Sequence, residues 1–93
     1  MKEINKLEKL KDDLRSKIKP GKKKVLERFF KTGPEQYGEG DVFLGVMVPQ
    51  TREVVKEYPD LEFKDIEELL KSKFHEERLT GLLILVNKFK KSQ

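Results

Sequence analysis

The chain has 93 residues and no cysteine, with 41% charged and 35% hydrophobic side chains and a formal net charge of +4. That length fits one small domain, and the lack of cysteine excludes disulfides and thiolate chemistry. The start of the chain is charged, unlike a signal peptide, and the longest apolar run, Leu82 to Val86, cannot span a bilayer, so we expect a soluble cytoplasmic protein.

Apolar residues at helical spacing predict the first two helices. One stripe of about four turns, ended by Pro20 and Gly21, is formed by Ile4, Leu7, Leu10, Leu14 and Ile18. A shorter helix follows, with its apolar residues at Val25, Leu26, Phe29 and Phe30. Its first turn holds three lysines. Cations are unfavourable at this N-terminal end, because it is the positive end of the helix dipole. This cost indicates that some other interaction favours the lysines there.

Turn-forming residues predict a loop over residues 32–41, after which Asp41 is suited to cap a helix. The glycines of this loop lack the spacing of a dinucleotide-binding fingerprint, and Glu39 and Asp41 would repel phosphate. Tyr37 is an aromatic residue in polar surroundings. It is suited either to stack on a base or sugar or to pack against the adjacent helix end.

Three more helices are predicted after the loop. Pro49 suits the first turn of the third, whose buried face is Val54, Val55 and Tyr58. The fourth is marked by Phe63, Ile66, Leu69 and Leu70. The fifth has a broad apolar face, with Ile84 on its far side, made of Leu79, Leu82, Leu83, Leu85, Val86 and Phe89. A face this broad predicts contacts on two sides, with further helices, with another molecule or with a second copy.

The expected fold is therefore all-α, with about five helices in antiparallel pairs that form a HEAT-like α-solenoid segment. We expect residues 1–93 to form a single helical-repeat domain and to be the N-terminal part of a longer solenoid. No two segments of the sequence align well with each other, so the repeat itself is not visible.

No catalytic or metal centre is predicted. His75-Glu76-Glu77-Arg78 resembles part of a zinc-protease helix, but the second histidine is missing and His75 is the only histidine in the chain. Adjacent carboxylates on a helix diverge by about 100°, so we expect the acidic pairs to be solvated surface. These pairs are Asp12-Asp13, Glu67-Glu68 and Glu76-Glu77. No cofactor is expected.

Three stretches together resemble AlkD-type DNA alkylation-repair proteins. They are Lys31-Thr32-Gly33-Pro34, the run Tyr37-Gly38-Glu39-Gly40-Asp41-x-Phe43-Leu44-Gly45-Val46-x-Val48-Pro49-x-x-Arg52, and His75-Glu76-x-Arg78. The resemblance covers about residues 25–90 and matches only the N-terminal part of the family. It implies a HEAT-like solenoid and a DNA glycosylase that releases positively charged N-alkylated purines.

The resemblance also implies that the catalytic Asp, a neighbouring Trp and a DNA-binding Arg come from later helices. The chain contains no Trp, so none of these roles is assigned to a residue here. We expect a scaffold that binds the DNA backbone and lacks glycosylase activity alone. Arg52 and Arg78 are expected to make structural or electrostatic contacts.

The charge distribution agrees with a polyanionic partner. Residues 1–31 carry 12 basic and 5 acidic side chains, whereas residues 32–93 carry 9 and 12. The candidate DNA-binding residues are Lys22, Lys23, Lys24, Lys31, Tyr37, Arg52, Lys88, Lys90 and Lys91. The charge alone is equally explained by a solvated lysine-rich surface. The alternative function is a helical protein-interaction module without a DNA role, and the last helix could also mediate self-association.

Overall fold

The computed structural model describes residues 5–30 and 42–91. The described part contains five helices and no strand, which confirms the all-α prediction. The helices are α1 (Lys6–Arg15), α2 (Lys22–Phe30), α3 (Val48–Glu57), α4 (Phe63–Leu70) and α5 (His75–Lys91). None of these helices is long and apolar enough to cross a membrane. A HEAT-like solenoid arrangement is not confirmed and stays a prediction.

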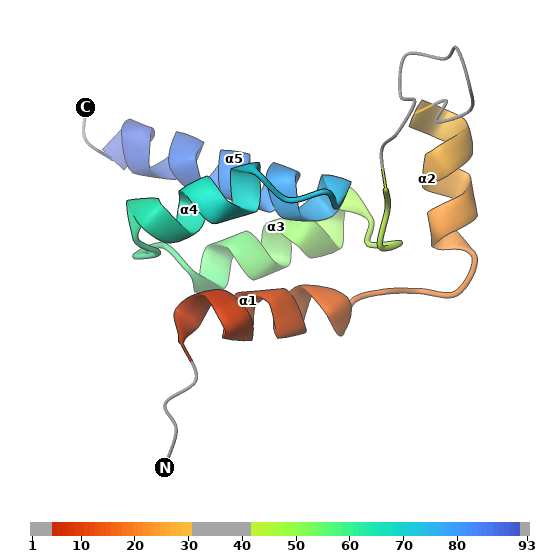
Figure 1. Ribbon diagram of the computed structural model, residues 1–93, viewed down its shortest axis with the longest axis horizontal. Coiled ribbons are helices and arrows are strands. Elements are labelled where there is room, and N and C mark those ends of the chain that lie inside the picture. Colours follow the sequence, from red (N-terminus) through yellow and green to blue (C-terminus); the bar gives the residue numbers. More distant parts are fainter. Residues whose placement is uncertain (1–4, 31–41, 92–93) are drawn as a thin grey trace.

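Four of the helices lie side by side, and α2 stands apart and runs across their direction (Figure 1). Helix α3 packs against both α1 and α5, and α4 packs antiparallel on α5. Because α3 and α5 run in the same direction, their C-terminal ends lie on the same side of the molecule (Figure 1). The shared core consists of Leu7, Leu10, Leu14, Val46, Val54, Val55, Tyr58, Leu61, Ile66, Leu69 and Ile84.

Helix α1 is shorter than its apolar stripe predicts. The Asn5 side chain caps it by accepting a hydrogen bond from the Glu8 amide at 2.8 Å. After Arg15 the backbone tightens, because the Lys17 and Ile18 amides donate to carbonyls only three residues back. Ile18 therefore lies beyond the end of α1 and is 41% exposed, so the prediction that it continues the apolar stripe of this helix is wrong. Ile4 lies outside the described residues.

Pro49 lies in the first turn of α3, as predicted. The residue at the N-cap is Met47, because residues 42–47 are not helical. The proposed capping residue Asp41 lies outside the described residues. Gly45, with φ +104°, occupies a left-handed backbone conformation that other residues rarely adopt.

Tyr58, just after α3, is buried, and its hydroxyl donates a hydrogen bond to the Asp13 carboxylate on α1. Burial, together with the bond to Asp13 and the nearby negative charges, raises the pKa of Tyr58 well above its usual value of 10. The neutral phenol is thus the form that stabilises the fold.

A pH titration of stability should reveal this contact. Above pH 10 tyrosine ionises in the unfolded chain but stays neutral in the folded one, so unfolding releases a proton and stability falls as pH rises. We expect the stability advantage of the native chain over Tyr58→Phe to shrink by about 1 kcal/mol between pH 10 and 11. Urea unfolding of both proteins at several pH values measures this. Parallel curves would show that Tyr58 ionises equally in both states.

Helix α5 buries a different face from the one predicted. Ile84, expected on the far side, is 1% exposed, whereas Leu82 is 49% and Phe89 65% exposed. The buried positions form a stripe at helical spacing: Glu76, Glu77, Thr80, Gly81 and Ile84.

The small and polar residues of that stripe bring α4 and α5 close together. A Cβ atom at position 81 would lie 2.9 Å from the Leu69 Cβ, so only glycine fits this crossing without a shift. The Thr80 hydroxyl donates to the Glu76 carbonyl at 2.7 Å within its own helix, which satisfies it in the core. The spacing of apolar residues in the sequence does not predict a buried helix face made of small and polar residues.

Candidate nucleic-acid interface

The predicted DNA-binding residues fall into two separate groups. Lys22, Lys23 and Lys24 begin α2, whereas Lys88, Lys90 and Lys91 end α5, on the opposite side of the molecule (Figure 1). Arg52 is exposed on α3. Lys31 and Tyr37 lie outside the described residues. The described candidates therefore do not form one compact site.

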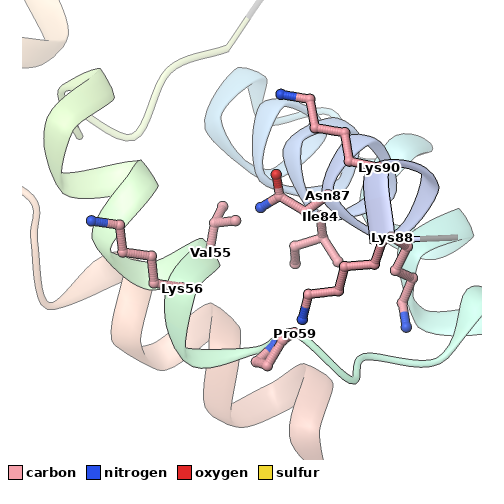
Figure 2. Close-up of a pocket in the computed structure, with 8 residues that line it drawn as sticks. Val55, Lys56, Pro59, Ile84, Asn87, Lys88 and Lys90 are labelled. Atoms are coloured by element: carbon pink, nitrogen blue, oxygen red, sulfur yellow. The ribbon is translucent and has the colours of Figure 1, made fainter. Parts of the chain in front are cut away.

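The α5 group surrounds a hollow of about 310 Å³ between α3 and α5, which we name the α3–α5 pocket (Figure 2). Its lining residues are Val55, Lys56, Pro59, Ile84, Asn87, Lys88, Lys90 and Lys91. The core residues Val55 and Ile84 form its floor. Lys56 and Lys90 extend from the two helices with their ammonium groups pointing away from the pocket (Figure 2), and both residues are exposed.

The helix dipole explains in part why lysines lie around the α3–α5 pocket, but it does not neutralise their charge. Both helices end here, and cations near a helix C-terminus interact favourably with its dipole. Within the described part of the chain, however, Lys56, Lys90 and Lys91 form no ion pair with an acid. Their charge remains available to a negatively charged ligand.

Lys56 was missed by the sequence analysis. It lies four residues after Arg52, so the two cations share one side of α3. The acids Glu53 and Glu57 follow a second line along the helix, and Glu53 pairs with Lys17 at 3.3 Å on the α1 side. The i, i+4 spacing of Arg52 and Lys56 was the available signal, but its meaning depends on α5 lying alongside.

The second group, at the start of α2, is held against the segment before α3. The Lys19 amide donates to the Gly45 carbonyl at 3.2 Å, and a Cβ atom at position 45 would lie 3.2 Å from the Lys23 amide nitrogen. Lys23 and Lys24 are exposed and no acid lies in the first turn. A basic helix start alone does not define a binding site.

Glu76 connects the segment before α3 to the start of α5. It is 1% exposed, and its carboxylate accepts the amides of Leu44, Gly45 and Val46 at 2.8–3.1 Å. Nearby, the His75 amide donates to the Val42 carbonyl at 2.8 Å. The expectation that Glu76 is solvated is therefore wrong. A buried carboxylate bonded to three backbone amides serves the structure.

Glu77 is also buried, again contrary to prediction. The Ser72 hydroxyl donates to its Oε1 at 2.7 Å. Its Oε2 lies 3.0 Å from Arg15 Nη1 but lacks the alignment of a hydrogen bond, so this contact is an ion pair only. Arg15 thereby joins the end of α1 to the start of α5. Both glutamates do lie in the first turn of α5, where the helix dipole favours acids.

The buried acids of the described chain are thus engaged within the fold. Glu76 is bonded to backbone amides, and Glu77 lies against Ser72 and Arg15. Within residues 5–30 and 42–91, no cluster of three or more histidine and acidic side chains could hold a metal ion. The exposed cations of the described surface are suited to bind anions.

Comparison with known proteins gives the family. The family model described as DNA alkylation repair enzyme matches residues 10–93, which include α2 to α5 and most of α1. No curated protein and no solved structure matches the chain. The match extends over nearly the whole chain and agrees with the motifs around Pro49 and Glu76. The chain therefore belongs to the DNA alkylation repair enzyme family.

Proposed function

We propose that this chain is a scaffold and DNA-backbone-binding segment of a DNA glycosylase that removes positively charged N-alkylated purines. The observation that carries the proposal is that Lys56, Lys90 and Lys91 line the α3–α5 pocket and pair with no acid of the described residues, on a chain of a DNA alkylation repair family. Phosphate contacts from such cations position a protein on DNA without reading its sequence. The site residues are Lys56, Lys90 and Lys91, with Arg52 one turn away along α3.

A binding titration tests the role of these lysines. Each phosphate neutralised by a cation contributes a slope of about −0.9 to the dependence of log affinity on log salt concentration. We expect the double variant Lys90→Gln/Lys91→Gln to bind a 20-base-pair duplex about tenfold or more weakly near 0.1 M salt, with a slope reduced by about 1.8. Fluorescence anisotropy over a range of salt concentrations measures both quantities.

The matched control is Lys71→Gln/Lys73→Gln, which removes the same charge from exposed positions just before α5 begins, at the end of that helix opposite to the pocket. If the loss of affinity reflects total charge only, the two double variants will bind equally weakly. Equal weakening, or an affinity of the native chain that ignores salt, would contradict the proposed interface.

We also expect the 93-residue chain to lack glycosylase activity by itself. Hydrolysis of the N-glycosidic bond needs a carboxylate placed near the developing sugar cation, and Glu76 and Glu77 are already engaged within the fold. In the proposed role that carboxylate is supplied from outside these residues. Incubation with methylated DNA should release no 3-methyladenine above a buffer control, and release would contradict the scaffold role.

A further inference from the structure

A second hollow lies on the side of α5 that faces α4, and its lining is aromatic and apolar. It measures about 520 Å³ and is lined by Phe63 at the start of α4 and by Leu85, Val86, Lys88 and Phe89 on α5. We name it the Phe63–Phe89 hollow. The antiparallel packing of α4 on α5 brings the start of one helix beside the end of the other (Figure 1).

The two phenylalanines are more exposed than the fold requires. Phe63 is 67% exposed and Phe89 65%, although the core contains a fully buried phenylalanine at position 43. Exposed aromatic faces next to cations are the elements with which proteins bind unpaired nucleic-acid strands, because every base can stack on a ring while lysines neutralise the phosphates.

Lys88 connects this hollow to the α3–α5 pocket, because it lines both. Its ammonium group lies over the Phe63 ring, 5.5 Å from the ring centroid. Lys90 and Lys91 follow within the same helical turn. A strand whose phosphates meet these lysines therefore has an aromatic surface within reach of its bases.

The charges around the hollow favour an anionic occupant. Among the described residues, no acid lines the hollow and none lies in the last turn of α5. The acid next to Phe63 in the chain, Glu62, is paired with Lys64 at 3.6 Å. A polyanion with planar bases fits this combination of rings and lysines better than a purely apolar partner does.

We propose that the Phe63–Phe89 hollow binds one unstacked base of a single-stranded or locally unpaired nucleic acid, whose phosphates lie on the lysines at the end of α5. The hollow is large enough for a base, since small-molecule sites span about 300–1,000 Å³. This inference rests on the proposed function, because it uses the same lysines as backbone contacts.

The test compares two ligands with equal charge. One is a decamer of thymidylate, and the other is a decamer of abasic nucleotides with the same phosphates and no bases. We expect the native 93-residue chain to bind the thymidylate decamer about tenfold more tightly, since stacking on an aromatic side chain accounts for about that factor per base. Equal affinity for the two ligands would overturn the proposal.

Variants locate the effect. Phe63→Leu/Phe89→Leu keeps the surface apolar and removes the rings, so it should bind both decamers equally and keep the native salt slope. Leu82→Ala, an exposed α5 residue outside the hollow, should retain the tenfold preference. A double leucine variant that retains the preference would also overturn the proposal.

The outcomes separate the two proposals. If neither decamer nor duplex binds, the proposed function fails and this inference fails with it. If both decamers bind equally with steep salt dependence, the lysine interface stands and only the stacking site fails. In the last outcome, sedimentation shows that the native chain forms dimers and that the double leucine variant does not, while the native chain binds both decamers equally. The hollow is then an interface between copies, and the stacking site is excluded.

Discussion

Replacement of Glu76 with alanine is expected to lower the free energy of unfolding by about 3–5 kcal/mol, because three backbone amides lose their acceptor. The amides of Gly45 and Val46 are buried and donate to Glu76 at 2.8 and 3.0 Å, and the Leu44 amide donates to both oxygens. A 93-residue domain has only about 5–14 kcal/mol of stability, so the variant should be close to unfolding at 25 °C. Urea denaturation followed by circular dichroism measures the loss.

Two further variants identify the cause of that loss. Glu76→Gln keeps one oxygen acceptor but turns an amide group toward backbone donors, so it should cost about 1–2 kcal/mol. Glu68→Ala, an exposed acid on α4, should change stability by less than about 0.5 kcal/mol. A loss for Glu76→Ala no greater than that for Glu68→Ala would show that the carboxylate does not hold the segment before α3.

Hydrogen exchange provides a local measurement for the same contact. In the native chain the amides of residues 44–46 should exchange slowly, since each donates to the buried carboxylate. In Glu76→Gln they should exchange faster while the amides in the middle of α3 change less. This pattern would locate the weakened contact even where the global stability changes little.

The Glu76 contact affects the candidate interface through the fold. It fixes the segment that leads into α3 to the first turn of α5, and these two helices then run in the same direction to the α3–α5 pocket (Figures 1 and 2). The lysines at their C-terminal ends line one pocket, and the contact between their N-terminal ends helps to hold the two helices side by side. Stability and the geometry of the basic surface are thus coupled at Glu76.

Sequence pattern predicted the helices well where burial follows apolar spacing. Leu7, Leu10 and Leu14 are buried on α1, and Val54 and Val55 on α3, as their spacing requires. Pro49 correctly marked the first turn of α3. These features depend on residues close together in the chain, so local rules suffice for them.

The buried glutamates could not be predicted in the same way. Glu76 bonds to amides about 30 residues earlier, and an acid in the first turn of a helix already has an adequate local explanation in the helix dipole. The candidate interface was predicted only in part, because one of its residues also depends on contacts between distant parts of the chain. The charges at the end of α5 are visible in the sequence, but the participation of Lys56 depends on how α3 lies against α5.

The orientation of α5 about its axis leads to the second prediction with a large effect on stability. Ile84→Ala should cost about 2–5 kcal/mol, because Ile84 is 1% exposed in the core formed with α3 and α4 and its loss leaves a cavity. Leu82→Ala, two residues earlier and 49% exposed, should cost less than about 1 kcal/mol. Chemical denaturation of the two variants compares side chains of equal size on one helix.

The comparison decides between two orientations of α5. The apolar pattern alone places Leu82 in the core and Ile84 outside, whereas close packing through Gly81 against Leu69 requires the reverse. A larger loss for Leu82→Ala than for Ile84→Ala would mean that α5 is rotated about its axis. Such a rotation would also remove Ile84 from the floor of the α3–α5 pocket and turn Phe89 away from Phe63, so both proposed binding surfaces depend on this result.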